Sequence, residues 1–149
     1  MNGFKISTDK KLLDFDVIYN FISNSYWAKA IPVEVMQKAI KNSLCFGVFK
    51  QDNDGKTTEQ VGFARVITDK ATFAYLADVF ILPAYQGLGL SKILVANIVA
   101  HPELQGLRRM MLATKDAHGL YQQYGFQPID NPDLLMQIAK PDIYLTDKK

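Results

Sequence analysis

An apolar strand that runs into a glycine-containing loop and then into a helix is the feature that most restricts how this chain folds. The strand ends near Leu82, the loop reads Gln-Gly-Leu-Gly at residues 86–89, and a helix is expected over Leu90–Ala100. Glycines at 87 and 89 let the backbone turn without a Cβ clash and approach a ligand closely. The first turn of the helix offers unpaired N–H groups and the positive end of the helix dipole. The segment therefore predicts an anion site, most often one for phosphate or pyrophosphate.

Three phosphate-binding patterns compete for this loop, and a plain strand-to-helix turn is a fourth interpretation. A Walker A loop needs G-x-x-x-x-G-K-[ST], a spacing that the chain lacks. A dinucleotide fingerprint needs G-x-G-x-x-G, but Lys92 occupies its last position and the loop comes late in the chain. Residues 86–91 resemble the pattern [QR]-x-x-G-x-[GA] closely and depart from it at Ser91, where the pattern has Gly or Ala. Serine is small enough to fit there, and its hydroxyl is able to contact a phosphate.

Hydrophobic periodicity predicts strands and helices along the whole chain. Strands are expected over Phe4–Ser7, 44–49, 60–68, 72–82 and 109–114, and helices over 12–23, from Pro32 onward, over Leu90–Ala100 and over 116–124. The tail after Phe126 is expected to supply one or two last strands. The order βααβββαβαβ is neither a βαβ repeat nor an all-β pattern. It predicts an α/β fold with one mixed sheet and helices on both faces.

Composition narrows the class of protein. The 149 residues fit one domain spanning 1–149, and 48% hydrophobic residues are enough for a core. The 17 basic and 15 acidic side chains nearly balance, which argues against a nucleic-acid binder that relies on broad electrostatic attraction. With one cysteine, Cys45, no intrachain disulfide is expected. Neither a signal-peptide core nor an apolar run of membrane-spanning length is present, so no membrane association and a cytoplasmic location are expected.

A second motif makes the interpretation more specific. The segment ATKDAHGLYQQYGFQPI resembles the pattern A-x-x-[FL]-Y-x-x-x-G-F at Ala117, Leu120, Tyr121, Gly125 and Phe126. Together with the loop at 86–91, it resembles the two signatures of the GNAT superfamily of acetyl-coenzyme A-dependent N-acetyltransferases, in the family's order. The resemblance extends from Phe4 to the last expected strand. It implies the GNAT fold, in which two parallel strands splay apart.

The resemblance also implies which residues bind acetyl-CoA, and it implies no metal. Pantetheine would enter between strands 74–82 and 109–114 like a missing strand, and the loop would hold the pyrophosphate. The expected cofactor-binding residues are Val79, Phe80, Ile81, Gln86, Gly87, Leu88, Gly89, Leu90, Ser91, Lys92 and Thr114. Thr114 stands where many relatives carry asparagine.

Tyr121 matches the family tyrosine that protonates the leaving thiolate, and it is the expected catalytic acid. Reference pKa values of about 10 for tyrosine and about 8.5 for a thiol make this transfer feasible without large tuning. The alternative is a tyrosine whose ring packs beneath the helix and whose hydroxyl bonds to backbone.

Asp78 interrupts the apolar run AYLADVFIL, where an unpaired carboxylate is costly. A hairpin that turns at residues 69–70 would place Arg65 opposite Ala74, and four residues along a strand separate Arg65 from Asp78 by roughly 13 Å. Asp78 is therefore predicted as a second catalytic residue, which binds the substrate amine or relays its proton. The alternative is an aspartate that pairs elsewhere or caps a bulge.

Tyr26 and Trp27 lie between the first two helices, a connection that walls the acceptor pocket in GNAT folds, so they are expected to bind substrate, with core packing as the alternative. The implied function is acetyl transfer from acetyl-CoA to the primary amine of a small-molecule or amino-acid-like acceptor. Acetylation of a protein N-terminus or lysine, and a CoA-binding module without turnover, are the alternatives. The oligomeric state stays open, with a homodimer as one outcome.

Overall fold

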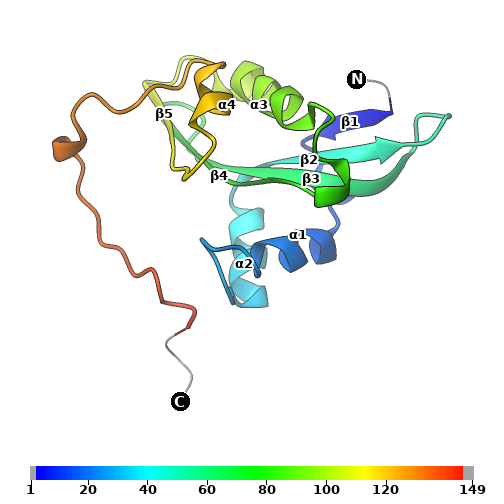
Figure 1. The fold of residues 1–149 in the computed structure, drawn as a ribbon, viewed down its shortest axis with the longest axis horizontal. Coiled ribbons are helices and arrows are strands. Elements are labelled where there is room, and N and C mark those ends of the chain that lie inside the picture. Colours follow the sequence, from blue (N-terminus) through cyan, green and yellow to red (C-terminus); the bar gives the residue numbers. More distant parts are fainter. Residues whose placement is uncertain (1–2, 146–149) are drawn as a thin grey trace.

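A five-stranded mixed sheet forms the centre of the computed structural model, which describes residues 3–145 (Figure 1). The strands are β1 (Phe4–Ser7), β2 (Leu44–Gln51), β3 (Thr57–Thr68), β4 (Phe73–Ile81) and β5 (Arg109–Leu112), and they lie in that order across the sheet. β1 to β4 pair antiparallel, whereas β5 runs parallel to β4. The predicted mixed α/β fold is confirmed.

Helices cover both faces of the sheet. α1 (Phe15–Ile22) and α2 (Val33–Lys41) lie on one face, and α3 (Leu90–Ala100) and α4 (His118–Gln122) lie on the other (Figure 1). The Asp14 carboxylate accepts the N–H groups of Asp16 and Val17 and so caps the start of α1. α3 ends just before Pro102, because proline cannot continue a helix. Among residues 3–145, no helix has both the length and the apolar character needed to cross a bilayer.

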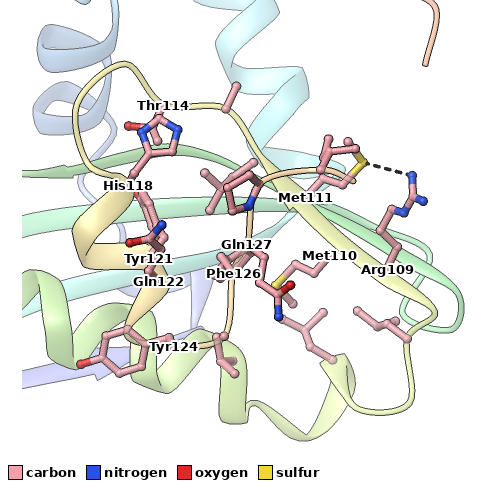
Figure 2. A pocket seen from close by; sticks show the side chains of 18 of the residues that line it. Arg109, Met110, Met111, Thr114, His118, Tyr121, Gln122, Tyr124, Phe126 and Gln127 are labelled. Carbon is pink, nitrogen blue, oxygen red and sulfur yellow. Dashed lines mark hydrogen bonds between the residues drawn. The ribbon is translucent and has the colours of Figure 1, made fainter. Parts of the chain in front are cut away.

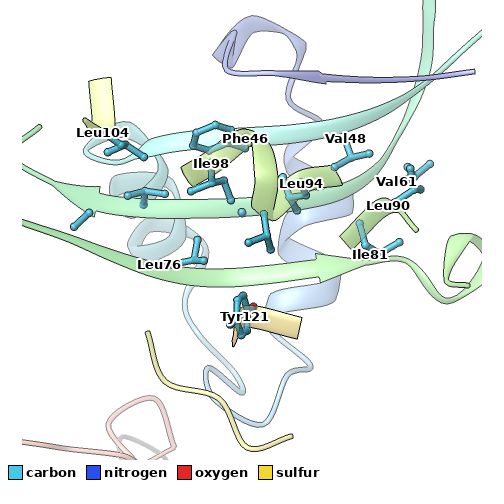
Figure 3. Close-up of a cluster of buried hydrophobic side chains, with 14 residues drawn as sticks. Phe46, Val48, Val61, Leu76, Ile81, Leu90, Leu94, Ile98, Leu104 and Tyr121 are labelled. Atoms are coloured by element: carbon cyan, nitrogen blue, oxygen red, sulfur yellow. The ribbon is translucent and has the colours of Figure 1, made fainter. Parts of the chain in front are cut away.

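The two faces of the sheet bury separate hydrophobic clusters, since successive strand residues point to opposite faces. The first cluster lies between the sheet and α3 and includes Phe46, Val61, Leu76, Leu94 and Tyr121 (Figure 3). The second packs α1 and α2 against the opposite face and includes Ile18, Ile22, Met36, Phe63 and Phe80. Each large apolar side chain buried in this way stabilises the fold by about 1.5–3 kcal/mol.

The hairpin between β3 and β4 corrects the register expected from the sequence. The Asp69 carboxylate accepts the N–H groups of Ala71, Thr72 and Phe73, which widens the turn. These hydrogen bonds lower the pKa of Asp69. As a result Thr68 pairs with Ala74, and Arg65 pairs with Ala77 rather than with Ala74. The expected register was wrong because it assumed a turn at residues 69–70.

The expected last strand does not form in the described chain. Residues 127–145 contain turns and one short 3-10 helix, Pro132–Leu134, and this segment runs away from the sheet (Figure 1). Pro128 and Pro132 lack N–H groups and bracket the point where the chain would have to reverse to pair with β5. The outer edge of β5 therefore has no neighbouring strand among residues 3–145.

Candidate active site

β4 and β5 separate halfway along β4. The two strands pair from Phe73 with Arg109 to Leu76 with Leu112, where β5 ends, and β4 continues to Ile81. Within the described chain, residues 77–81 therefore have no strand beside them on this side. Such an edge offers N–H and C=O groups to an extended ligand. The splayed strand pair expected from the sequence is present.

The three expected pantetheine-binding residues lie on this open stretch of β4. Phe80 and Ile81 are buried, and Val79 is half-buried against the first cluster. Phe80 packs into the second cluster, so its side chain serves the core. What these residues can offer an extended ligand is their backbone. The Ile81 carbonyl already accepts a hydrogen bond of 2.9 Å from the Gln86 side chain.

The glycine loop presents a row of free backbone donors at the start of α3. Gly87 and Gly89 have φ of 84° and 82°, a conformation that favours glycine, and Gly89 is the N-cap of α3. A Cβ at Gly87 would meet nothing within 4 Å, so its backbone conformation, not lack of space, calls for glycine there. In the part of the chain that the structure describes, nothing accepts a hydrogen bond from the backbone N–H groups of residues 87–92. This is the arrangement of an anion cradle.

The side chains of the loop fix it in place and leave it accessible. Gln86 ties the loop to the end of β4 through the Ile81 carbonyl, and Leu90 is buried in the first cluster. Leu88 and Lys92 are exposed, and Ser91 is half-buried. The loop is therefore held at both ends while its donors stay open.

Tyr121 combines a buried ring with a hydroxyl that has no hydrogen-bond partner among residues 3–145. The ring packs in the first cluster, edge-on to Phe126 at 5.8 Å between centroids (Figure 3). Burial, and to a smaller extent the charge of Tyr26, raises the pKa of Tyr121. The phenol is thus protonated at neutral pH and free to donate, and the backbone-bonded alternative is not observed.

Thr114 shapes the turn that leads into α4. Its Oγ1 accepts the Ala117 N–H at 3.1 Å, and the side chain lies near His118 and Tyr121 (Figure 2). Its hydroxyl therefore has a structural contact just before the helix that carries Tyr121.

Asp78 sits at a bulge where β4 leaves β5. Phe63 pairs with Phe80 and Arg65 with Ala77, so two residues of β4 stand opposite one of β3. Asp78 adopts φ of 55°, which is unusual for a residue other than glycine. The bulge places the carboxylate next to the residue that register counting had put out of reach.

Both oxygens of the Asp78 carboxylate are engaged. Oδ2 accepts from Arg65 Nε at 2.7 Å, and Oδ1 accepts from Trp27 Nε1 at 2.7 Å. Arg65 Nη1 also donates to Ser43 Oγ at 3.1 Å. The premise that Asp78 has no partner within reach was therefore wrong, because the longer turn and the bulge both shift the strand pairing.

The side chains of Tyr26 and Trp27 are exposed and do not pack in the core. We call this pair of aromatic residues the lip. Tyr26 is 62% and Trp27 42% exposed, and their rings meet edge-on at 5.1 Å. The Lys115 ammonium lies 4.3 Å from the centroid of the Tyr26 ring. The lip thus joins the α1–α2 connection to the β4 bulge and to the segment after β5.

Sequence reasoning missed Lys115 and the role of Arg65. Lys115 lies inside the second motif, in ATKDAHG, but nothing local in the sequence indicates that it reaches the ring of Tyr26. Asp69 followed by Thr72 was the available signal for the wider turn that brings Arg65 to Asp78.

A large hollow lies on the outer side of β5, apart from the glycine loop. Its volume is about 820 Å³, and its lining includes Met110, Leu112, Thr114, Tyr121, Phe126 and Ile129 (Figure 2). Residues 86–91 are not part of this lining. The hollow therefore touches the candidate site at Thr114 and at α4, which carries Tyr121.

A splayed parallel strand pair beside a donor-rich glycine loop is the arrangement of an acyltransferase. Residues 15–126 match the model of the acetyltransferase (GNAT) family. A protein of Gibberella zeae that is named as an acetyltransferase is 36% identical over 135 residues, which cover 79% of this chain and 75% of that protein.

Solved structures agree. A crystal structure of a GNAT-family protein from Xanthomonas campestris pv. campestris has 52% identity and a TM-score of 0.89, and the match covers 98% of this chain and 99% of that chain. N-acetylglutamate synthase from Neisseria gonorrhoeae, complexed with coenzyme A and L-arginine, shares the fold with a TM-score of 0.66 at 17% identity, over 92% of this chain and 30% of that chain. The chain belongs to the GNAT family and is an acetyltransferase.

Proposed function

We propose that this enzyme moves an acetyl group from acetyl-CoA to the primary amine of a small, amino-acid-like acceptor. The observation that carries the donor half is the row of free N–H groups at residues 87–92, beside the open edge of β4. A diphosphate fits such a row, and amides fit such an edge. Acetyl-CoA, when bound, supplies an activated thioester.

Tyr121 is the proposed acid in this reaction. Its raised pKa keeps the phenol protonated, and its hydroxyl has no competing partner in residues 3–145. It donates its proton to the departing sulfur, so that the thiol leaves in neutral form. Backbone groups at Val79, Phe80 and Ile81 hold the pantetheine arm in line with it, and Thr114 fixes the turn before its helix.

Asp78 acts on the acceptor through Trp27 in this proposal. Because Arg65 and Trp27 engage both carboxylate oxygens, Asp78 is a positioning residue that holds the lip above the splay. The aromatic faces of Tyr26 and Trp27 narrow the entrance, which suits a small acceptor. The Lys115 ammonium adds a positive charge at the entrance, which suits an acceptor with a carboxylate beside its amine.

An acceptor screen that follows the release of free coenzyme A thiol tests the proposal. The panel pairs each amino acid with the corresponding amine that lacks the carboxylate, and adds peptides with a free N-terminus or with a lysine only. We expect turnover with amino-acid-like amines, reduced several-fold for the partners without a carboxylate. Turnover with peptides alone would indicate protein acetylation. Acetyl-CoA binding without turnover on any acceptor would indicate a binding module.

A further inference from the structure

Arg65 has N–H groups that the described chain leaves without a partner. A guanidinium carries five N–H donors. In Arg65, Nε donates to Asp78 Oδ2 at 2.7 Å and Nη1 donates to Ser43 Oγ at 3.1 Å, whereas Nη2 has no acceptor within residues 3–145. In the buried and half-buried residues of that range, no side-chain nitrogen is both enclosed and unpaired. Nη2 is therefore accessible, in a side chain that is 16% exposed.

The guanidinium of Arg65 lies level with the point where β4 and β5 separate. Arg65 pairs with Ala77, which directly follows the last pair between the two strands, Leu76 with Leu112. On its other side Arg65 pairs with Cys45, a member of the second cluster. Residues directly opposite on neighbouring strands share a face of the sheet, so the Arg65 side chain is on the α1–α2 face.

Two contacts fix the orientation of this guanidinium. Asp78 holds its Nε, and Ser43 holds its Nη1. The Ser43 hydroxyl is itself fixed, because it donates to the Ala39 carbonyl of α2 at 2.7 Å. Trp27 donates to the other oxygen of Asp78, so one carboxylate joins the guanidinium to the lip. An arginine that is already held in this way loses little conformational freedom when it binds a ligand.

Lys115 is the other cation near the lip, and it differs from Arg65 in two respects. Its side chain is exposed, and its printed contact is with the ring of Tyr26 at 4.3 Å. An ammonium is a compact, strongly hydrated charge, and salt screens it when it is exposed. A guanidinium is less hydrated and presents a planar fork of donors that matches a carboxylate. Lys115 is thus suited to attract an anion and Arg65 to bind a carboxylate by its shape.

We propose that Arg65 binds the carboxylate of the acceptor through its free N–H groups and so selects amino acids over amines that lack a carboxylate. The inference rests on the proposed transfer to an amino-acid-like acceptor, and it names the contact that recognises this class. A carboxylate on a guanidinium forms strong, directional hydrogen bonds. An acceptor without the carboxylate leaves these donors unpaired, which is why it binds less well. Asp78, whose two oxygens are engaged, orients Arg65.

Matched acceptors test this assignment. Glycine, L-alanine and L-leucine are each compared with the α-carboxamide of the same amino acid, and KM is measured from the release of free coenzyme A thiol. In the wild type we expect the KM of the carboxamide to exceed that of the acid at least about tenfold, as for hydrogen bonds to a charged group. Arg65→Lys keeps a cation for Asp78 but lacks the planar fork, so this ratio should fall close to one. Comparing the ratio between variants cancels the different basicity of the two amines.

Two further variants serve as controls. Trp27→Phe changes the lip and not the guanidinium, so it should raise both KM values by the same factor and preserve the ratio. Lys115→Gln removes the exposed, screened cation and should preserve most of the ratio. A ratio that collapses in Lys115→Gln would assign the carboxylate to Lys115 and overturn the inference, whether or not Arg65→Lys folds. Equal increases of both KM values in Arg65→Lys would show a merely structural role and would overturn it as well.

The fluorescence of Trp27, the sole tryptophan of the chain, gives a readout that needs no turnover. It is titrated with the same acids and carboxamides in the presence of coenzyme A. We expect the acid to saturate the change at a concentration at least about tenfold lower than the carboxamide, and Arg65→Lys, checked by melting temperature, should abolish this difference. Carboxylate-dependent binding without turnover on any amine would contradict the proposed acetyl transfer and leave the Arg65 site standing. Turnover and binding without a preference for the acid in the wild type would overturn the Arg65 site alone.

Discussion

The proposed donor half and the proposed acceptor half of the candidate site differ in the chemical groups that they present. The donor half, at residues 86–92 and the open edge of β4, consists of backbone groups. The acceptor half, at Tyr26, Trp27, Asp78 and Lys115, consists of side chains from three separate parts of the chain. Backbone groups present the same chemistry whatever the side chains are, so the donor half suits a ligand that the whole family shares. Side chains change with every substitution, so we expect specificity for the acceptor to arise in the proposed acceptor half.

The largest expected effect is on the donor half. Gly89→Asp places a Cβ and a negative charge at a position with φ of 82°, beside the donors proposed for pyrophosphate. We expect acetyl-CoA affinity to fall at least about 100-fold by calorimetry, since the strained backbone and the like charge both oppose binding.

Gly55→Asp is the matched control for this change. Gly55 has φ of 81° in the turn between β2 and β3, with nothing within 4 Å of an added Cβ. It imposes the same strain and charge far from the loop and should leave affinity unaltered. Equal losses for the two variants would mean that the effect is on stability and that the loop holds no anion.

Tyr121→Phe removes one hydroxyl from the boundary between the two halves. The ring keeps its packing, and the lost group has no partner in the described chain, so stability and acetyl-CoA affinity should be nearly native. We expect kcat to fall about 100-fold, the lower end for a general acid.

The pH dependence gives an independent readout for Tyr121. Its pKa is raised, so the protonated acid persists at alkaline pH, and the wild-type kcat should decline only above the usual tyrosine value of about 10. The Phe variant should lack that decline. Native turnover in Tyr121→Phe would show that the thiolate leaves without this acid.

The smallest expected kinetic effect is on the acceptor half. Trp27→Phe keeps an aromatic ring but removes the hydrogen bond to Asp78. The KM for the acceptor should rise about three- to tenfold, the size of one typical hydrogen bond of about 1 kcal/mol. Acetyl-CoA affinity should stay native.

Asp78→Asn separates positioning from stability. It should raise KM in the same way and also lower the free energy of unfolding by about 1–3 kcal/mol, because Arg65 loses its charged partner. The double variant Trp27→Phe/Asp78→Asn tests whether the two residues act through one contact. If they do, its effect on KM should be smaller than the sum of the two single effects, and simple addition would contradict a shared role.

Local patterns predicted several elements well, including the loop and helix of the proposed donor half. The helix Leu90–Ala100 and the strand Phe4–Ser7 have the expected bounds, and the loop between β4 and α3 has the expected left-handed glycines. These features depend on neighbours in sequence, namely on glycine conformations, apolar periodicity and the proline after the helix. A sequence carries such information without knowledge of the rest of the fold.

The acceptor half depends on contacts that no local pattern encodes. One Asx-type turn at Asp69 moved the pairing of Arg65 by three residues, from Ala74 to Ala77, and one bulge at Asp78 shifted the pairing of β4 beyond that point. The expected last strand after Phe126 is absent from the described chain for a similar reason, because a local pattern says nothing about which sheet edge a segment pairs with. The sequence predicted the type of most elements correctly but did not predict which residues pair across the sheet.

The extra residue at the Asp78 bulge also decides which side of the sheet each later residue of β4 faces. Before it, Ala74 and Leu76 point to the α3 cluster; after it, Ile81 does so, and Phe80 points to the α1–α2 cluster. In the first half of β4 the even-numbered residues therefore face the α3 cluster, and in the second half the odd-numbered residues do so. Deleting Asp78 would restore the regular two-residue alternation and leave Val79, Phe80 and Ile81 on their present faces. The deletion would instead remove the carboxylate that joins Arg65 of β3 to Trp27 of the α1–α2 connection.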